Sequence, residues 1–414
     1  MTAREKDIKL NNSKVFCMMP WIHTHVWPSG KAFPCCMSDS TVEYGNLNDN
    51  SLKEIWNNEK YRQLRLNMLN DDETYECRRC YEMEKSNVFT LRNMVNQYYK
   101  HPTHWDRVES TQVDGTVEEL NMGYMDIRIS NICNFRCRSC SPELSSAWYE
   151  EHIKLYGYTP SDPKMMNIAN NEKFWNDLQP LLLTVEEACW AGGEPIITEE
   201  HYKILDFWIN NKMKDVRLRY TTNFSNLYFK KKSILEYWNS FKDVRIAASL
   251  DGMGKRGELI RAGTEWEVIE ENRKQMIKEC PDVYFEITPT VSIMNVYHLP
   301  DFHKEWIDKG LLEPQNVRMN ILTYPTEYRI QIIPPKERKK FIDKYTEHIK
   351  WIDDNFGDGA AKRGFESVLD FLQQENYENL IPDFIDRNTP LDELRGESLY
   401  QVAPELEFFR DYEH

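Results

Sequence analysis

The chain has 414 residues, of which 41% are hydrophobic and 13% aromatic, and this composition suffices for two or three globular domains. Its 52 Lys and Arg residues face 67 Asp and Glu residues, a net charge of −15, so no extended nucleic-acid surface is expected. Residues 1–10 lack a signal-peptide pattern, and no apolar run approaches the ~18 residues of a membrane span. A cytoplasmic protein without membrane association is therefore expected.

The chain contains ten cysteines, eight of them in tight groups. In a chain without a secretion signal, this usage favours metal binding in a reducing compartment over a disulfide framework. The two isolated cysteines, Cys189 and Cys280, have apolar sequence neighbours and are interpreted as buried thiols.

Residues 1–96 are predicted to form a small cysteine-bearing module. A hairpin is expected over residues 27–34, because Gly30 supplies the positive φ of a tight turn. A helix is expected over residues 51–69, with Ser51 as N-cap and Glu54 completing a capping box. Hairpin and helix would bring together Cys17, Cys35, Cys77 and Cys80, with Cys36 as a substitute ligand. Structural zinc is an alternative for four such cysteines, and His23 and His25 are interpreted as packing residues.

A polar stretch at residues 97–120 is predicted to be a linker. Strands then alternate with helices, which implies a parallel sheet, because parallel neighbours need crossover connections. The expected strands are residues 124–130, 185–190, 216–221, 244–250, 283–291 and 317–322. Residues 121–324 are too short for an eight-fold barrel, so the predicted fold class is α/β, with an open (β/α)6 barrel.

Residues 325–414 show a weaker pattern. Helices are expected at residues 335–356 and 365–378, followed by an acidic tail broken by prolines. This C-terminal extension contains no chemical motif. A helical cap or an oligomer surface is favoured over a substrate lid.

Three cysteines, Cys133, Cys137 and Cys140, follow the first expected barrel strand, with three and then two residues between them. Iron–sulfur clusters are usually held by four cysteine thiolates, so three on one loop leave one coordination site for another group. A zinc site or buried thiols are the alternative for this loop alone.

The spacing of these cysteines resembles the signature of the radical S-adenosylmethionine (SAM) superfamily. The resemblance implies that they hold a [4Fe-4S] cluster, whose open iron binds the amino and carboxylate groups of SAM. The segment Gly192-Gly193-Glu194-Pro195 is similar to the second half of this signature, and its glycines permit the close approach of SAM to backbone amides.

The same resemblance implies further contacts with SAM. Asn223, Ser249 and Asp251, which follow later strands, would contact its ribose and carboxylate. As isolated residues, each is also a common turn or cap former. Ser139 stands where the superfamily usually has an aromatic residue, so the adenine would lean on Phe135 or on a later strand.

Cys17, Gly30 and Cys35, with the later Cys-x2-Cys, are similar in spacing to the first part of the SPASM and twitch auxiliary-cluster domains of radical SAM enzymes. The resemblance implies a second [4Fe-4S] cluster on Cys17, Cys35, Cys77 and Cys80, and the glycine spacing favours Cys35 over Cys36. Here the module precedes the barrel, whereas in most relatives it follows it. The further cysteines of a full SPASM domain are missing after Cys80, so one auxiliary cluster is expected.

The function implied is reductive cleavage of SAM to a 5′-deoxyadenosyl radical, which removes hydrogen from a substrate, with electrons from a flavodoxin- or ferredoxin-like donor. Four cysteine ligands would make the auxiliary cluster an electron relay or acceptor, whereas three would let it bind substrate. Peptide or protein modification is ranked first, and dehydrogenation or rearrangement of a sugar, cyclitol or nucleotide second. The alternative of another class is a non-enzymatic iron–sulfur or zinc scaffold.

Overall fold

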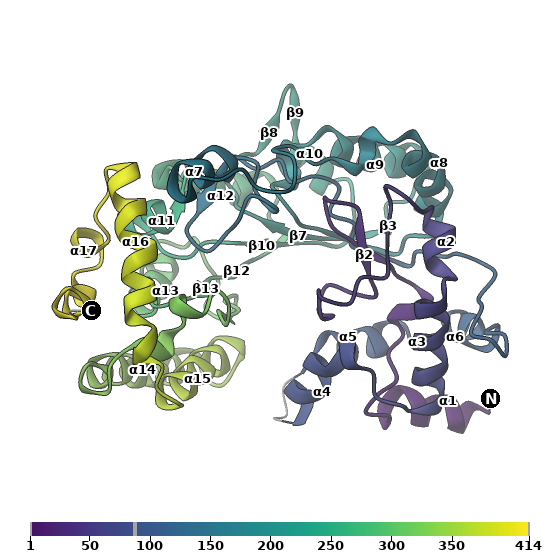
Figure 1. The fold of residues 1–414 in the computed structure, drawn as a ribbon, viewed down its shortest axis with the longest axis horizontal. Helices are drawn as coiled ribbons and strands as arrows, with labels where there is room; N and C mark the ends of the chain where they lie inside the picture. Colours follow the sequence, from purple (N-terminus) through teal and green to yellow (C-terminus); the bar gives the residue numbers. More distant parts are fainter. Residues whose placement is uncertain (1, 86–88, 413–414) are drawn as a thin grey trace. The chain divides into compact units, whose positions relative to one another are not determined.

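The computed structural model describes residues 2–85 and 89–412 (Figure 1). Its internal contacts divide the chain into two compact units, each assembled from segments far apart in the sequence. The first unit contains Met1–Asn131, Met165–Arg219 and Ser240–Asp243, and the second contains Ile132–Lys164, Tyr220–Asn239 and Val244–His414. The four consecutive domains expected from the sequence stay a prediction.

The predicted hairpin of the N-terminal module is confirmed. Strand β1 (His25–Val26) pairs antiparallel with β2 (Lys31–Phe33), and β3 (Gly45–Asn46) adds to the other edge of β2. Gly30 in the turn has a φ of 88°, and a Cβ atom there would lie 2.5 Å from the Asn46 Oδ1 atom. Glycine is therefore required in this turn for both backbone conformation and space.

The helix expected over residues 51–69 is divided into α2 (Leu52–Trp56) and α3 (Glu59–Asn70). The predicted capping box of Ser51 and Glu54 is present at the start of α2. The division occurs because Asn58 has an extended backbone and its side chain caps α3 by accepting from the Tyr61 amide at 3.0 Å.

The stretch at residues 97–120, expected to be a linker, contains a helix. Trp105 and Val108 on this helix are 1% and 2% exposed, and Val117 beyond it is also buried. Burial of these apolar side chains gives the segment a packed structure that its polar composition did not indicate. The helices of this part of the module are α1 (Ala3–Asn11), α4 (Arg78–Lys85), α5 (Leu91–Tyr98) and α6 (Pro102–Glu109).

The first unit also contains the beginning of a parallel sheet. Strand β4 (Tyr124–Met125) pairs in parallel with β6 (Glu187–Trp190), and the amide of Arg217 in β7 (Arg217–Thr222) donates to the Glu186 carbonyl at 2.9 Å. Helices α8 (Glu172–Leu181) and α9 (Glu199–Asn210) belong to the same unit.

The hairpin of the module lies along the other side of β4. Val26 forms a parallel bridge with Ile127, and the Arg128 amide donates to the Val26 carbonyl at 2.8 Å. His23 and His25 contact the Tyr124 and Asp126 carbonyls through their Nδ1 atoms, both at 2.9 Å. The N-terminal module thus extends the sheet, and both histidines have the packing role expected of them.

The second unit also contains parallel strands. Strand β10 (Val244–Ala248) pairs in parallel with β12 (Tyr284–Ile287), and the Ser249 amide donates to the carbonyl of Thr222 at the end of β7. Strands β13 (Thr290–Val291) and β14 (Asn320–Ile321) form a further parallel pair. A mixed α/β fold with a parallel sheet is therefore confirmed, whereas the open six-unit barrel stays a prediction.

The remaining elements of this part of the second unit are two strands and several helices. The β8 and β9 strands form an antiparallel hairpin. The elements are α7 (Trp148–Tyr156), β8 (Tyr228–Phe229), β9 (Lys232–Ser233), α10 (Ile234–Trp238), α11 (Gly254–Ile260), α12 (Trp266–Glu279) and α13 (Leu299–Asp308).

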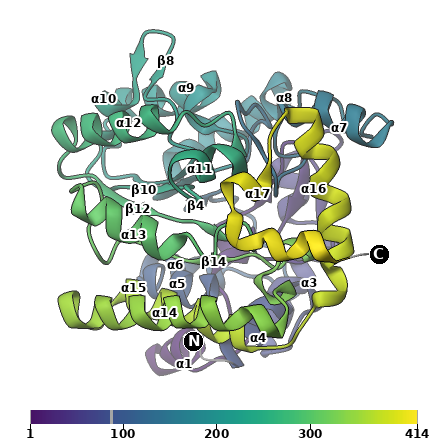
Figure 2. The same ribbon diagram turned by 90° about the vertical axis from the view of Figure 1, so that its left-hand side faces the viewer.

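The C-terminal extension is helical. The expected helix at residues 335–356 is confirmed as α14 (Pro335–Phe356), which lies beside α15 (Ala360–Gln373) (Figures 1 and 2). The tail, expected to be broken by its prolines, instead contains α16 (Ile381–Arg395) and α17 (Leu399–Val402). Helix α16 tolerates Pro390 because buried Phe384, Asn388 and Leu391 hold one face of the helix.

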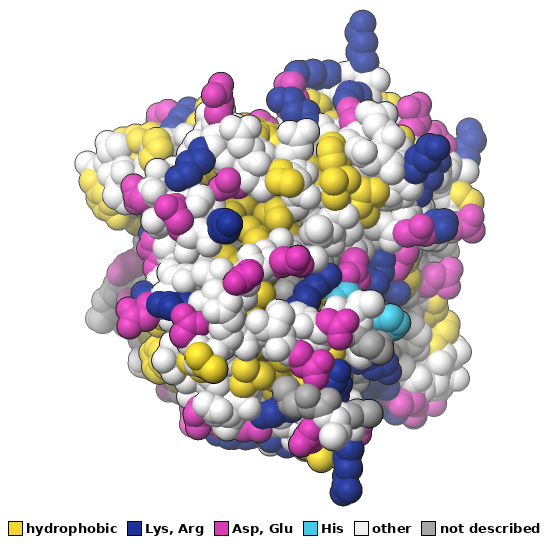
Figure 3. Space-filling model, turned by 90° about the vertical axis from the view of Figure 1, so that its right-hand side faces the viewer, with side chains coloured by type: hydrophobic (Ala, Val, Ile, Leu, Met, Phe, Trp, Pro, Cys, Tyr) yellow, Lys and Arg dark blue, Asp and Glu magenta, His cyan; other side chains and the backbone are white. Residues whose placement is uncertain are grey.

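Within residues 2–85 and 89–412, no helix is both long and apolar enough to span a membrane. Acidic and basic side chains are interspersed over the face of the molecule drawn in Figure 3. The net charge of −15 is thus accompanied on this face by basic groups.

Candidate metal centres

A small cavity in the first unit is lined by the four cysteines predicted to meet there: Cys17, Cys35, Cys77 and Cys80. Cys35 follows the hairpin, Cys77 ends the short helix η2 (Tyr75–Cys77), and Cys80 lies on α4. All four carry free thiols. The other lining residues are mostly apolar: Val15, Met19, Met37, Ser38, Met68, Leu91 and Arg92.

The environment of these thiols opposes their ionisation. Burial raises the pKa of Cys77 to about 12 and raises the pKa of Cys17 and Cys80 as well. Burial also raises the pKa of Cys35, and the neighbouring thiols add to this effect. A coordinated metal reverses such a shift, because a coordinating thiol is deprotonated. Four thiols in an apolar cavity therefore fit the donor set of an iron–sulfur cluster.

Cys36 faces a different environment from its neighbour Cys35. Burial raises the pKa of Cys36, and the next largest causes are Asp126, which is 1% exposed, and Cys189. Cys36 is not among the residues that line the four-cysteine cavity. The geometry thus favours Cys35 over Cys36 as the ligand.

The surroundings of Cys189 differ from the expectation, whereas Cys280 lies as expected. Cys189 on β6 interacts with Asp126, Arg128 and Tyr124, so it belongs to a polar face of the sheet. The apolar neighbours in sequence were misleading, because alternate residues of a strand point to opposite faces. Cys280 is 1% exposed, with its Sγ atom 3.4 Å from the Leu235 carbonyl.

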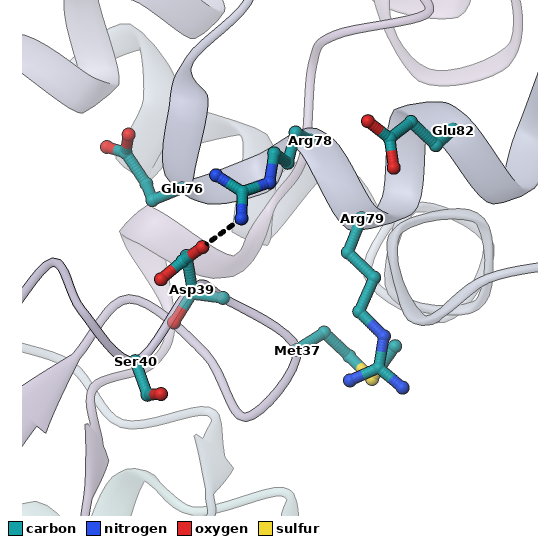
Figure 4. Close-up of a pocket in the computed structure, with 8 residues that line it drawn as sticks. Met37, Asp39, Ser40, Glu76, Arg78, Arg79 and Glu82 are labelled. Carbon is teal, nitrogen blue, oxygen red and sulfur yellow. Dashed lines mark ion pairs between the residues drawn. The ribbon is translucent and has the colours of Figure 1, made fainter. Parts of the chain in front are cut away.

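A polar pocket of about 320 Å³ adjoins the four-cysteine cavity (Figure 4). Arg78 pairs with Asp39 at 2.5 Å, and the Asp39 amide donates to the Glu76 carbonyl at 3.0 Å. These contacts join the loop after Cys35 to the segment that carries Cys77 and Cys80. The pocket residues thereby hold the ligand-bearing segments together. They are Met37, Ser38, Asp39, Ser40, Glu76, Arg78, Arg79 and Glu82.

The three-cysteine loop lies in the second unit. Strand β5 (Arg136–Cys137) pairs antiparallel with β11 (Arg261–Ala262), which places Arg261 opposite Cys137. Gly263, with a φ of 110°, directly follows β11. A Cβ atom at position 263 would lie 2.8 Å from the Asn134 carbonyl oxygen, so only glycine lets the two segments approach.

Hydrogen-bond donors in this unit point at the cysteine sulfurs. The Phe135 amide lies 3.4 Å from the Cys133 Sγ atom, and the Arg261 Nη1 atom lies 3.6 Å from the Cys137 Sγ atom. Burial raises the pKa of Cys137 while Arg261 acts to lower it, and burial raises the pKa of Cys140 to about 12. Donors directed at partly buried sulfurs fit thiolate ligands.

The loop is anchored by a residue that the sequence did not single out. Arg138, between the second and third cysteines, is fully buried and pairs with Asp392 and, at 2.8 Å, with Glu397. Arg395 donates to the Arg136 carbonyl at 2.7 Å. The C-terminal extension therefore holds the cysteine loop in place. The signal in the sequence was only a charged residue among cysteines, and its partners are more than 250 positions away.

Two of the predicted SAM contacts of the second unit, Asn223 and Asp251, are connected to this loop. The Asn223 Nδ2 atom donates to the Asn134 Oδ1 atom at 2.9 Å, and Phe135 is 1% exposed. Asp251 has both carboxylate oxygens engaged, with Arg261 and with the Thr290 amide, each at 2.7 Å. Asp251 therefore orients the arginine that contacts Cys137. Ser249 contributes its amide to the sheet contact with Thr222.

The glycine-rich segment lies in the first unit. Gly192 and Gly193 have φ values of 84° and 56°, and a Cβ atom at position 192 would lie 2.7 Å from the Arg128 Cβ atom. Glu194 is 1% exposed and accepts from the Ile196 amide at 3.2 Å, which caps the short helix η5 (Pro195–Ile197). These packing and capping contacts fix the conformation of the segment.

Among the residues that the structure describes, no group of three or more His, Cys, Asp or Glu side chains is arranged to hold a single metal ion.

Comparison with known proteins gives one family match. Residues 17–81 match SPASM, the iron–sulfur cluster-binding domain, over the segment that contains Cys17, Cys35, Cys77 and Cys80. A search of curated proteins found no match.

Solved structures give weaker matches. One, described as histidine-tagged anSMEcpe with bound AdoMet, is 16% identical, has a TM-score of 0.40, and is matched over 57% of this chain and 60% of that one. SuiB of Streptococcus suis, bound to the precursor peptide SuiA, is 14% identical, with a TM-score of 0.35 and coverages of 66% and 57%. The chain thus spans less than two thirds of either protein.

The family match confirms the auxiliary-cluster domain expected from the cysteine and glycine spacing. It covers the hairpin, the division between α2 and α3, and the first turn of α4, which carries Cys80. Residues 17–81 thus match the SPASM iron–sulfur cluster-binding domain, and the chain also contains the Cys-x3-Cys-x2-Cys loop at residues 133–140.

Proposed function

We propose that this protein is a radical SAM enzyme with one auxiliary iron–sulfur cluster. The observation that carries the proposal is the three-cysteine loop, in which the Phe135 amide and the Arg261 guanidinium are directed at two of the three sulfurs. The SPASM domain supports it independently, because it supplies a second cluster-binding segment. A [4Fe-4S] cluster with SAM supplies a 5′-deoxyadenosyl radical, which removes hydrogen from a substrate.

The residues of the loop have distinct roles in this proposal. Cys133, Cys137 and Cys140 hold the cluster and leave one iron for SAM. Arg261, itself held by Asp251, stabilises the negative charge of the Cys137 thiolate. Buried Arg138 fixes the backbone between the second and third ligands.

The SAM-binding residues are proposed from the sequence resemblance. Gly192, Gly193 and Glu194 would receive the amino and carboxylate groups of SAM, and the positive φ values of the two glycines leave the backbone accessible. Asn223 and Ser249 are proposed to contact the ribose and carboxylate of SAM. Asp251, which also orients Arg261, is proposed to contact the ribose or carboxylate of SAM, and Phe135 is proposed to support the adenine.

The auxiliary cluster is proposed to be an electron relay or acceptor. Four cysteines line its cavity, so the cluster would have a full set of protein ligands and no open site for a substrate. A flavodoxin- or ferredoxin-like protein is proposed as the electron donor. A peptide or protein segment remains the first-ranked substrate, and a sugar, cyclitol or nucleotide the alternative.

The proposal is tested on anaerobically reconstituted full-length protein. We expect about eight irons per chain in the wild type and about four in a Cys133/Cys137/Cys140 triple alanine variant. We also expect wild-type protein with dithionite and SAM to release 5′-deoxyadenosine, and the triple variant to release none. Cys280→Ala serves as the control, since this thiol is buried elsewhere in the second unit and is expected to leave both readouts unchanged.

Two results would contradict the proposal. Wild-type protein that holds zinc in place of iron would assign the cysteines to structural sites. Protein that holds about eight irons but releases no 5′-deoxyadenosine would support the scaffold alternative.

A further inference from the structure

Arg92 forms part of the wall of the four-cysteine cavity, although it lies beyond the SPASM match, which ends at residue 81. It belongs to α5, whose N-cap is Thr90. Arg92 is 4% exposed, so its charge is buried beside four thiols. A buried guanidinium is costly unless it is paired, and its contacts therefore indicate what it stabilises.

The guanidinium is fixed between two segments that carry cluster ligands. Its Nη1 atom donates to the Phe16 carbonyl at 2.8 Å and to the Ser13 carbonyl at 3.0 Å, immediately before Cys17. Its Nε atom donates to Glu84 at 3.0 Å, and its Nη2 atom also pairs with Glu84. Glu84 lies on α4, the helix that carries Cys80.

Arg92 places its positive charge in the wall of the cavity that the four cysteines line, between the segments that carry Cys17 and Cys80. Glu84, on the helix that carries Cys80, is the counter-ion of Arg92 and partly offsets this charge.

We propose that Arg92 raises the reduction potential of the auxiliary cluster. Reduction adds one electron, and therefore one negative charge, to a cluster inside an apolar cavity. The potential of an iron–sulfur cluster depends on net charge, on hydrogen bonds to its sulfurs and on solvent exposure. A buried cation in the wall of the cavity favours the reduced state, and it makes the cluster a better electron acceptor. The inference rests on the proposed cluster at Cys17, Cys35, Cys77 and Cys80.

The test is a redox titration followed by electron paramagnetic resonance. It uses the full chain with Cys133, Cys137 and Cys140 replaced by alanine, so that only the auxiliary cluster gives a signal. In this background we expect R92Q to lower the equilibrium constant for reduction about tenfold, which is about 59 mV for one electron. R92K, which keeps the charge, should recover part of this loss.

R79Q is the matched control. Arg79 is next to Cys80 in sequence, but its side chain is exposed, and solvent screens exposed charges. We expect R79Q to shift the potential by much less than R92Q. Equal shifts in the two variants, or no shift in R92Q with its cluster intact, would overturn the inference.

E84Q gives a second test that does not depend on R92Q retaining iron. Removing the counter-ion leaves the charge of Arg92 less compensated, so E84Q should raise the potential. A potential that falls or stays unchanged in E84Q overturns the inference. Absence of about four irons from the triple alanine protein itself would overturn the proposed auxiliary cluster, whereas a loaded cluster with an unaltered potential would overturn only the role of Arg92.

Discussion

The two cysteine sites are constructed in different ways. The three-cysteine loop takes its thiols from eight consecutive residues, Cys133 to Cys140, and its sulfurs are half-buried and contacted by an amide and a guanidinium. The four-cysteine cavity takes its thiols from three segments spread over residues 17–80, and its walls are mostly apolar. The first site is formed by the backbone conformation of one loop, which distant residues hold in place. The second site is a cavity formed where three segments pack together.

This difference has consequences for how each site can fail. The loop depends on distant anchors, since Arg138 pairs with Asp392 and Glu397 of the C-terminal extension. The cavity depends on the hairpin and on the helices that bring its cysteines together, and on Arg92 for charge compensation. Loss of the Arg138 anchor should therefore release iron from the loop, whereas loss of Cys35 should release iron from the cavity.

The largest effect is expected from a pair of variants that distinguishes Cys35 from Cys36 as the cluster ligand. Cys35→Ala should remove the auxiliary cluster and reduce iron from about eight to about four per chain, because Cys35 lines the cavity. Cys36→Ala should retain about eight, because that thiol faces Asp126 and Cys189. Iron and sulfide analysis measures both. Iron loss in Cys36→Ala but not in Cys35→Ala would show that Cys36 is the ligand.

A smaller but distinct effect is expected from the anchor of the loop. Arg138→Met leaves two carboxylates without their buried partner and should lower the free energy of unfolding by about 3 kcal/mol. The variant should also lose iron from the three-cysteine loop while the auxiliary cluster remains. Urea unfolding and iron analysis test these expectations.

Arg318→Met is the control for this variant. Arg318 pairs with Glu286 at 2.7 Å, but its side chain is 66% exposed, so the expected loss is about 0–1 kcal/mol. Equal losses in the two variants would mean that Arg138 acts as an ordinary surface charge. An Arg138→Met variant that keeps the cluster of the three-cysteine loop would show that Arg138 is not needed to hold the loop in place.

A further expected effect concerns the pH dependence of stability. His303 and His348 form a buried pair in the second unit, 3.0 Å apart between Nδ1 and Nε2, and burial lowers the pKa of both, that of His303 to about 4. Between pH 6.5, the usual histidine value, and pH 4, the unfolded chain binds protons that the folded chain does not. Stability should therefore fall as the pH is lowered through this window, by at most ~1.4 kcal/mol per pH unit for each histidine.

Unfolding curves at several pH values test this expectation. His348→Phe removes one titrating group and should give a shallower decrease on acidification, whereas His101→Gln, at an exposed position in the first unit, should leave the slope unchanged. Because the pair lies in the unit that contains the three-cysteine loop, acid should release iron from the loop before the cavity. Simultaneous release, or an unaltered slope in His348→Phe, would contradict this view.

The sequence by itself determined the features that depend on neighbouring residues. The Ser51 and Glu54 capping box, the turn at Gly30 and the helix at residues 335–356 were predicted as the structure has them. The spacing of Cys133, Cys137 and Cys140 was equally readable, because a short loop fixes the separation of its own thiols. The SPASM domain was recognisable for a similar reason, from cysteines and a glycine at set intervals.

Tertiary structure alone decided which distant groups meet. It placed Arg92 beside the cysteines of the SPASM domain, Arg138 beside the C-terminal helix, and Cys189 on a polar face that its sequence neighbours did not reveal. It also gave the expected linker a buried Trp105. Spacing along the chain encodes local conformation, whereas the partner of a buried charge or thiol is chosen by packing between segments that share no local pattern.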